Sequence, residues 1–567
     1  MKKTALVCIN AKFIHSALGI YSISRYAKKQ GIEVDVLEYS INHNEMVIDM
    51  DVFKGHYDVV AFSCYIFNIE YVIKVASVLK KANPHLSIWL GGPEVSFSPE
   101  EYLSYPFVDG VMIGEGEVTF AELYHADFCA TNILGCAYKK DGEILKNAPR
   151  PTIANLDEIP FAYSEEDLPK LKDKLIYYET SRGCPFRCSY CLSSTDHGVR
   201  YYSLDRVREN LLFFISHHIP LVKFVDRTFN ADNRRAAEIM RFIANNPGET
   251  TFHMEISADL LTDEICEIVE NSRDGLFQVE VGIQSTNPKT LDAICRGDHF
   301  EGIKRSVLAL LKTKKAHVHV DLIAGLPYEN LDTFKASFNT VYALHAHDLQ
   351  LGFLKLLKGT KIRAEKAIHH YRFTDYPPYE IIGNDFLEYA DIVRLKKIED
   401  VLERYHNSQS FILSLSFLES KYSDAFTMFD ELSKYFCKIG QSMQPCSKPL
   451  LYDFLVAFYR EKFGDTDEFC VYLAYDYYQN LKVGKAPDWY LDKSDETFRE
   501  SCLEFLYDED HIKTYLPEFM GEPPKKILKH VRFLQFPFDP LNRDEKGKIV
   551  YIFENISKSA IKIVENA

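Results

Sequence analysis

Short apolar runs alternate with longer amphipathic segments along the first third of the chain. The apolar runs predict buried strands at residues 4–9, 33–39, 58–64, 87–90 and 110–113. The amphipathic segments predict helices near residues 17–29, 42–54, 68–81, 98–104 and 117–125. Strands and helices that alternate at this spacing indicate a parallel, doubly wound sheet of the Rossmann type.

Glycine and polar residues follow three of these predicted strands. Ser63-Cys64-Tyr65 follows the third, Gly91-Gly92-Pro93-Glu94 the fourth, and Gly114-Glu115-Gly116-Glu117 the fifth. Ligands of doubly wound sheets bind at the carboxyl ends of the strands, and paired glycines let a ligand approach the backbone closely. The pattern therefore predicts a ligand site at this edge, although a fold that has lost its ligand would keep the same strand pattern.

The middle of the chain repeats the strand–helix alternation. Its strands are expected at residues 176–180, 221–226, 251–257, 277–284, 317–324 and 349–357, and six such units favour a partial (β/α)6 barrel. One face of three successive strands is polar: it carries His253, Glu255 and Ser257, then Gln278, Glu280, Gly282 and Gln284, then His317, His319 and Asp321. Closed barrels fill their lumen with branched apolar residues, so a polar face here predicts a lumen with a polar occupant. An antiparallel sheet with one wet face is the alternative.

The strand–helix rhythm stops near residue 376. Amphipathic segments at 384–405, 423–439, 448–463 and 494–508 predict a mostly α-helical C-terminal domain. We expect four parts: a Rossmann-like domain over 1–135, a connector with a hairpin over 136–170, a barrel over 171–375 and the helical domain over 376–567.

Composition agrees with a multidomain globular protein. The 567 residues exceed one ordinary domain, and 46% hydrophobic with 26% charged residues is typical of globular chains. An odd count of thirteen cysteines argues against a disulfide framework and for a reducing compartment. Without an apolar run of bilayer length, we expect no membrane association and a cytoplasmic location. A net charge of −16 without a long basic run predicts no nucleic-acid partner.

Three cysteines have the spacing of a metal centre. Cys184, Cys188 and Cys191 form a Cys-x3-Cys-x2-Cys pattern behind a predicted strand. Three thiolates leave one iron of a 4Fe–4S cluster without a protein ligand, whereas closed electron-transfer clusters use four cysteines. An open metal position indicates chemistry. A zinc knuckle completed by His197, or three unrelated buried thiols, are the alternatives.

The stretch Arg182-Gly183-Cys-x3-Cys-x-Tyr-Cys resembles the signature of the radical S-adenosylmethionine (SAM) enzymes. With the Rossmann-like domain ahead of it, the chain resembles the cobalamin-dependent (class B) members, in a subgroup whose C-terminal domain has no assigned role. The resemblance implies that Cys184, Cys188 and Cys191 bind a 4Fe–4S cluster. It also implies SAM contacts, which fall on Tyr190, Asp226, Glu255, Ser257, Glu280, Gln284, Arg296 and Asp321.

The same resemblance implies a cobalamin site at the first sheet. Ser63, Gly91, Gly92 and Glu115 stand where class B proteins contact the cofactor. The stretch 13–19 departs from the usual cobalt-ligating motif because no aspartate precedes His15 to orient its imidazole. We therefore expect a cobalamin whose cobalt has no histidine ligand, with His15 as the alternative.

The implied reaction is reductive cleavage of SAM to a 5′-deoxyadenosyl radical, followed by methylation of an unactivated carbon of a small-molecule or peptide substrate. An electron donor such as flavodoxin or ferredoxin would be a partner. A non-methylating rearrangement, an empty cobalamin domain, and a cobalamin- or redox-sensing protein without turnover are the alternatives. A methylthiolating RNA enzyme fits less well, because no second cysteine trio and no basic tail are visible.

Overall fold

A computed structural model describes residues 2–195, 198–297, 299–481, 487–490, 496–555 and 559–563. His197, the candidate fourth ligand of a zinc knuckle, lies outside them, as do residues 494 and 495 of the last predicted helix. The chain forms two compact units. The first comprises Met1–Ala346 and Leu351–Ile392, and the second comprises His347–Gln350 and Val393–Ala567.

The first sheet has seven strands in the order β2-β1-β3-β4-β5-β6-β7. Their bounds are β1 Thr4–Asn10, β2 Asp35–Ser40, β3 Val59–Ser63, β4 Ser87–Gly91, β5 Gly110–Met112, β6 Cys136–Lys140 and β7 Glu143–Lys146. The first five run parallel, which confirms the doubly wound sheet. The hairpin β6–β7 pairs antiparallel with β5, so the sheet continues past residue 135.

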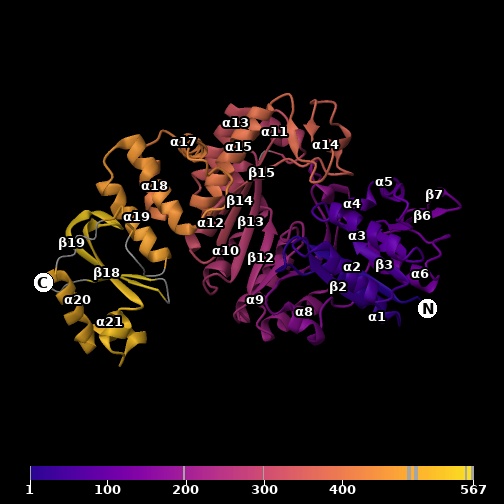
Figure 1. Ribbon diagram of the computed structural model, residues 1–567, viewed down its shortest axis with the longest axis horizontal. Coiled ribbons are helices and arrows are strands. Elements are labelled where there is room, and N and C mark those ends of the chain that lie inside the picture. Colours follow the sequence, from indigo (N-terminus) through magenta and orange to yellow (C-terminus); the bar gives the residue numbers. More distant parts are fainter. Residues whose placement is uncertain are drawn as a thin grey trace. The chain divides into compact units, whose positions relative to one another are not determined.

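Helices connect and cover these strands (Figure 1). They are α1 Leu18–Lys29, α2 Glu45–Lys54, α3 Ile69–Ala82, α4 Pro93–Ser96, α5 Pro99–Leu103 and α6 Gly116–His125. The Asn44 side chain caps α2 by accepting a hydrogen bond from the Met46 amide. β1 is buried along its whole length, as expected for a central strand covered on both faces. This core holds the loops at the carboxyl ends of the strands in place.

The second sheet has the order β15-β14-β13-β12-β11-β8. Its strands are β8 Leu175–Tyr178, β11 Leu221–Phe224, β12 Thr251–Ile256, β13 Phe277–Gln284, β14 His317–Ala324 and β15 Asp348–Phe353. The main connecting helices are α8 Leu204–Ser216, α9 Asn233–Asn245, α10 Asp263–Glu270, α12 Phe300–Thr313 and α13 Leu331–Tyr342. The pairs from β8 to β14 are parallel, which supports the partial barrel and not the antiparallel alternative.

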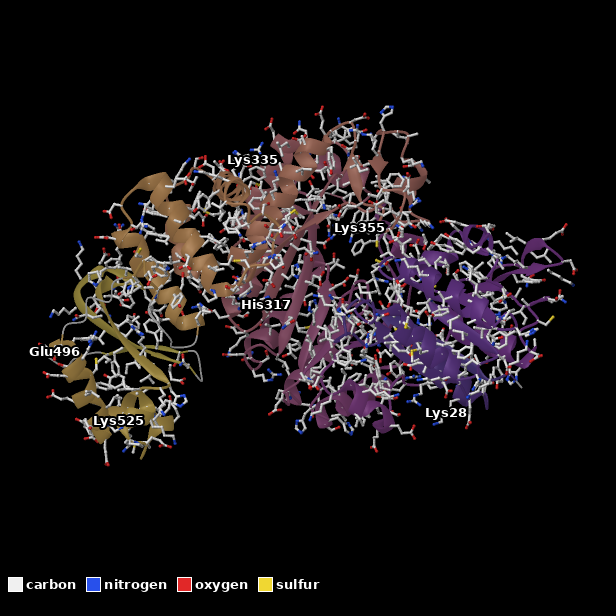
Figure 2. All side chains as sticks on the ribbon, in the orientation of Figure 1. Lys28, His317, Lys335, Lys355, Glu496 and Lys525 are labelled. Atoms are coloured by element: carbon white, nitrogen blue, oxygen red, sulfur yellow. The ribbon has the colours of Figure 1, made fainter. Side chains whose placement is uncertain are left out.

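The two faces of the barrel strands differ as the alternation predicts. Along β14 the apolar residues Val318, Val320 and Leu322 are fully buried. The polar residues between them, which begin with His317 (labelled in Figure 2), are half-buried. The strand β12 alternates in the same way, and β13 does so up to its last residue. The apolar faces pack into the core, and the polar faces line the lumen.

The loop after β1 lies along the open edge of the barrel sheet. The Ser16 amide donates to the Leu175 carbonyl at 3.2 Å, and the Leu175 amide donates to the Ile14 carbonyl at 2.7 Å. The Ser16 hydroxyl also accepts a hydrogen bond from the Tyr177 amide at 2.9 Å. Backbone pairing therefore joins the Rossmann-like domain directly to β8.

The second unit is mainly helical, as expected, and also contains a sheet. Its helices include α16 Ile412–Glu419, α17 Ala425–Lys438, α18 Lys448–Phe463, α19 Asp467–Asn480, α20 Glu496–Tyr507 and α21 Glu509–Tyr515. The helix α15, Tyr389–Leu402, leads into it. An antiparallel sheet of β18 Val531–Asp539, β19 Asn542–Glu554 and β20 Ala560–Ile563 was not predicted from the sequence. Among the described helices, none has the length and apolar content that a bilayer crossing requires.

Candidate functional site

The three cysteines follow a short strand, β9 Ser181–Cys184, which pairs antiparallel with β10 Gly198–Tyr201. Gly183 has a φ of +96°, and a Cβ there would lie 2.0 Å from the Gly198 carbonyl oxygen. Only glycine fits this close approach of two backbones. The close pairing of β9 with β10 therefore fixes the position of Cys184 at the start of the cysteine loop.

Backbone contacts hold the cysteine loop against the barrel. The Ser189 amide donates to the Ile294 carbonyl at 2.9 Å, and the Ile362 amide donates to the Ser189 carbonyl at 2.9 Å. Cys188 is buried, whereas Cys184 and Cys191 are half-buried. Partly accessible thiols on an anchored loop suit metal ligation better than they suit packing alone.

Arg296 lies beside this loop, together with Tyr190. The guanidinium Nη1 is 3.6 Å from Cys188 Sγ and 3.4 Å from Tyr190 Oη, and Nη2 donates to the Gly282 carbonyl. Burial raises the pKa of Cys188, and the positive charge of Arg296 opposes this effect. The structure thus brings two predicted SAM-contacting residues to the cysteine loop.

Gln284 has an unusual backbone and an unused polar atom. Its φ is +72°, and the register between β13 and β14 shifts between Gly282 and Gln284. A non-glycine residue in the left-handed region costs on the order of 1 kcal/mol and often marks a functional position. Its Oε1 is buried without a hydrogen-bond partner among the described residues. An orphaned acceptor of this kind fits a polar ligand.

A small recess lies next to the cysteine loop. Its lining includes Phe186 from the loop, Ser257 after β12, Ser285 after β13, and Arg296. The carboxyl ends of two barrel strands therefore open toward the loop.

The barrel lumen contains a network that joins strands β11 to β13. The Lys223 ammonium is 2.9 Å from Glu280 Oε2 and 4.0 Å from Glu255 Oε1. His253 Nε2 lies 2.9 Å from the same Glu280 oxygen. On β14, His319 Nε2 is 2.8 Å from Asp321 Oδ1. Glu255, Glu280 and Asp321 thus lie in the lumen together with Lys223, a residue that was not predicted to belong to the site.

The lumen carboxyl groups differ in their protonation. Burial opposes ionisation of Glu280, but His253 and Lys223 lower its pKa to about 2. Burial and the nearby Glu280 raise the pKa of Glu255 to about 7. Two neighbouring carboxyls with separated pKa values are a frequent feature of active sites.

Two other predicted cofactor residues have their oxygens occupied by the protein. Asp226 is buried and accepts hydrogen bonds from the Thr180 amide, the Thr180 hydroxyl and the Ser181 hydroxyl at 2.6–2.8 Å. Glu115 accepts from Arg182, from Arg200 and from the Ile153 amide. Asp226 therefore anchors the segment that leads to Cys184, and Glu115 joins an ionic network.

The loops after β3 and β4 touch at the carboxyl edge of the first sheet. The Cys64 amide, next to Ser63, donates to the Gly91 carbonyl at 2.7 Å. Gly92 has a φ of +109°, and a Cβ there would lie 2.6 Å from the Cys64 carbonyl oxygen. Gly92 therefore lets the two loops meet, and no side chain could be added there without moving a backbone.

Three exposed aromatic side chains lie on segments that follow strands of the first sheet. Phe13 follows β1, Phe67 follows β3 and Phe97 follows α4; their exposed fractions are 64%, 44% and 40%. Glycine-lined loops with exposed rings fit a large cofactor with apolar faces.

His15 reaches the barrel. Its Nδ1 forms a 2.7 Å hydrogen bond with the Tyr177 hydroxyl of β8, and the two rings stack with 5.7 Å between centroids. Burial and the positive charges of Lys12 and Lys223 lower the pKa of His15. Tyr177 thus orients the imidazole, a role that an aspartate has in the usual cobalt-ligating motif.

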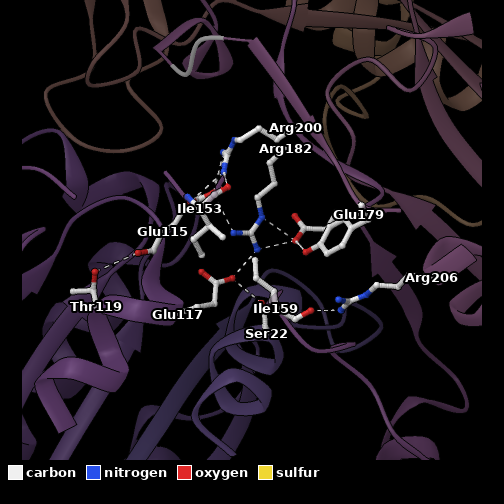
Figure 3. A network of polar contacts seen from close by, with 11 residues as sticks. Ser22, Glu115, Glu117, Thr119, Ile153, Ile159, Glu179, Arg182, Arg200 and Arg206 are labelled. Carbon is white, nitrogen blue, oxygen red and sulfur yellow. Dashed lines mark hydrogen bonds and ion pairs between the residues drawn. The ribbon is translucent and has the colours of Figure 1, made fainter. Parts of the chain in front are cut away.

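A partly buried ionic network joins the hairpin β9–β10 to the N-terminus of α6 (Figure 3). We call it the Arg182 network; it comprises Arg182, Arg200, Glu115, Glu117 and Glu179. Arg182 lies 3.2 Å from Glu115, 2.6 Å from Glu117 and 2.8 Å from Glu179. Burial opposes ionisation of Glu117, but Arg182 and the Ser22 hydroxyl lower its pKa. Carboxylates at this helix N-terminus also interact favourably with the helix dipole.

Three protein families match consecutive parts of the chain. Residues 4–124 match the B12 binding domain, and residues 178–341 match the Radical SAM superfamily. Residues 367–553 match a family described as a protein of unknown function, DUF4080. The first two matches cover the first sheet and most of the barrel.

Two curated relatives match the same region. An uncharacterized methyltransferase of Pyrococcus horikoshii is 30% identical over 301 residues, which cover 51% of this chain and 64% of the relative. The cobalamin-dependent radical SAM methyltransferase TokK of Streptomyces tokunonensis is 26% identical over 343 residues, or 56% of this chain and 50% of TokK. The chain thus spans between half and two thirds of the length of these relatives.

A solved structure shares the fold. The cobalamin-dependent SAM radical enzyme OxsB, with aqua-cobalamin and SAM bound, aligns with a TM-score of 0.60 at 15% identity. The alignment covers 84% of this chain and 78% of that chain. The chain therefore carries a B12-binding domain followed by a radical SAM domain, the combination found in the cobalamin-dependent radical SAM enzymes that it resembles, and a C-terminal region that matches a family of unknown function.

Proposed function

We propose that this protein is an enzyme that cleaves SAM reductively and methylates an unactivated carbon of a polar small molecule or peptide. The observation that carries the proposal is the position of the cysteine loop. The Arg182 network joins its leading strand β9 to the edge of the B12-binding sheet, and Arg296 joins the loop itself to β13 of the barrel. A reaction that needs both cofactors requires this arrangement.

The donor set fits the proposed cofactors. Cys184, Cys188 and Cys191 would hold the 4Fe–4S cluster. We assign SAM to Tyr190, Ser257, Gln284, Arg296 and the neighbouring lumen carboxyls Glu255, Glu280 and Asp321, with Asp226 anchoring the loop. We assign cobalamin to Ser63, Gly91, Gly92 and the loop that contains Glu115. When bound, the cluster with SAM supplies radical chemistry and cobalamin supplies a methyl carrier, while the protein orients them.

The lumen residues favour a polar substrate. Glu280 stays ionised between Lys223 and His253, whereas Glu255 can hold a proton near neutral pH. An apolar substrate would displace the remaining solvent from these polar groups without replacing its hydrogen bonds, which is costly. We therefore infer a substrate with hydrogen-bonding or charged groups. We also propose a cytoplasmic location and an electron donor such as flavodoxin or ferredoxin as a partner.

The domain assignment follows the same division. We assign residues 1–135 to the cobalamin domain, to whose sheet the hairpin β6–β7 adds two strands. Apart from this hairpin, we assign residues 136–170 to the connector. We assign residues 171–375 to the radical SAM barrel and residues 376–567 to the C-terminal domain.

The test is anaerobic reconstitution with iron, sulfide and hydroxocobalamin, followed by methyl-labelled SAM and a reductant. We expect both iron–sulfur and corrinoid absorption, 5′-deoxyadenosine, and label on the corrinoid. The exposed Cys437 gives a matched control, because Cys437→Ala should behave as wild type while Cys188→Ala should not. A protein that takes up no corrinoid would favour an empty cobalamin domain. Corrinoid uptake and SAM cleavage without methyl label would favour a rearrangement, and corrinoid uptake without SAM cleavage would favour a sensor.

A further inference from the structure

We propose that Arg182 and Glu117 are positioning residues that couple the cobalamin loops to the iron–sulfur hairpin, so that filling the cobalamin site alters the cluster. The inference rests on the two-cofactor arrangement proposed above. It goes beyond that arrangement because it assigns a role to residues that lie outside both cofactor-binding sets.

Both glycine-bearing loops of the first sheet end in a buried glutamate. Gly91-Gly92-Pro93 leads to Glu94, and Gly114-Glu115-Gly116 leads to Glu117; their exposed fractions are 5% and 3%. A buried carboxylate is costly unless a cation or several hydrogen bonds compensate its charge. Each of these glutamates therefore needs a dedicated partner.

The barrel supplies a cation to each glutamate. Lys358, which follows β15, lies 3.3 Å from Glu94, and Arg182 of β9 lies 2.6 Å from Glu117. Neutral donors from the first domain complete both sites: the Tyr102 hydroxyl bonds Glu94 at 2.8 Å and the Ser22 hydroxyl bonds Glu117 at 2.7 Å. The loops that would hold cobalamin are thus joined to the barrel through two buried ion pairs.

Only one of the two pairs leads directly to a cluster ligand. A single residue, Gly183, separates Arg182 from Cys184, and Gly183 is in close backbone contact with Gly198. Arg182 also pairs in register with Arg200 of β10, and Arg200 lies 2.9 Å from Glu115. Figure 3 shows both arginines directed at the glutamates of the α6 N-terminus. The hairpin that ends in Cys184 is therefore held from the cobalamin side.

The geometry makes this connection stiff. The Arg182 guanidinium contacts three carboxylates at once, and its planar fork fixes the direction of each contact. A shift of the loop at residues 114–117 would either move Arg182 or leave the buried Glu117 carboxylate without its cation, which is unfavourable. A ligand that orders this loop must therefore bias the hairpin, and the effect is reciprocal by linkage.

The experiment compares the electron paramagnetic resonance (EPR) spectrum of the reduced cluster before and after hydroxocobalamin is added. In wild type we expect cobalamin to change the cluster signal. Arg182→Gln and Glu117→Gln should reduce that change at least threefold and weaken corrinoid binding about tenfold, with Arg182→Lys in between. Arg25→Gln is the matched control, because Arg25 forms a similarly buried ion pair with Asp167 that does not involve the hairpin.

A second readout needs no cofactor. Hydrogen exchange of the apo-protein should show that residues 115–118 and 181–184 lose protection together in Glu117→Gln, but not in Arg25→Gln. This measurement keeps the inference testable if Arg182→Gln does not fold. Arg182→Gln and Glu117→Gln proteins that bind both cofactors with an unchanged cobalamin response would overturn the inference. A wild-type protein that binds no corrinoid would instead overturn the proposed function.

Discussion

At the residue scale, backbone geometry identifies positions that composition does not. Gly91 and Gly92 are adjacent and both contact Cys64, yet only Gly92 has a left-handed backbone on which an added Cβ would meet the Cys64 carbonyl oxygen. Arg182 would be an ordinary charged residue without its three carboxylate partners. Such residues take their roles from the atoms around them.

Gly92→Ala should destabilise the protein and abolish corrinoid uptake. The added Cβ would lie 2.6 Å from the Cys64 carbonyl oxygen at a positive φ, so we expect a loss of more than about 1 kcal/mol in the free energy of unfolding. In Gly91→Ala the Cβ would lie 3.7 Å from Met112, an ordinary contact, and stability should change by less than about 0.5 kcal/mol. Denaturant unfolding measures the stability of the two variants, and corrinoid titration measures their corrinoid uptake. Equal behaviour of the two variants would contradict the account.

Glu329 predicts a pH dependence of stability. It is fully buried, bonds the Ser285 and Ser337 hydroxyls, and burial raises its pKa to about 7. The folded state therefore binds the proton more tightly than the unfolded state. The protonated carboxyl stabilises the fold at low pH, and this stabilisation is lost as the pH rises toward 7. Replacement by glutamine removes the titration.

As the pH rises from 4.5 to 8, we expect the free energy of unfolding of Glu329→Gln to increase by about 2–3 kcal/mol relative to that of wild type. Chemical unfolding across this range measures the difference. Glu301→Gln, at an exposed position of α12, should leave the profile unchanged. A pH-independent difference between Glu329→Gln and wild type would refute the titration.

The sequence predicted the cluster ligands but not every contact around them. Cys184, Cys188, Cys191, Tyr190 and Arg296 stand out by spacing and by resemblance, and the structure brings them together. Lys223 gives no such signal, because it is one polar residue in an otherwise apolar strand. The protein partners of Asp226 and Glu115 are also invisible in a sequence, since they depend on segments at distant positions.

At the scale of elements, periodicity predicted the lumen well. A period of two places every second residue of β12 and β14 on one face, and the structure buries the opposite face. The same argument fails for the C-terminal sheet. The first half of β19, Asn542–Lys548, is polar and exposed and contains Gly547, so it has the composition of a loop.

Lys223→Met should destabilise the barrel strands. The substitution removes the ammonium group that contacts Glu280 and lies near Glu255. We therefore expect the free energy of unfolding to fall by about 2 kcal/mol. Thermal unfolding of the cofactor-free protein measures the loss. The double variant Lys223→Met/Glu280→Gln should regain part of it, because the uncompensated charge is gone. Lys312→Met, at an exposed position, is the control, and a loss of equal size there would rule out the network as the cause.

At the scale of the whole molecule, every predicted cofactor residue lies in the first compact unit. Within that unit, the loop after β1 pairs with β8, Lys358 pairs with Glu94, and Arg182 pairs with Glu117. The cobalamin domain and the barrel therefore share backbone bonds and buried charges. The order of the domains was predictable from strand–helix rhythm, but these contacts between them were not.

The proposed SAM-binding cluster is tested by the EPR spectrum of the reduced, reconstituted protein with and without SAM. We expect a four-iron cluster signal that SAM changes, because three cysteines leave one iron open to it. We also expect that Cys188→Ala loses this response. A cluster signal that SAM leaves unchanged in wild type, or a normal response in Cys188→Ala, would contradict the account.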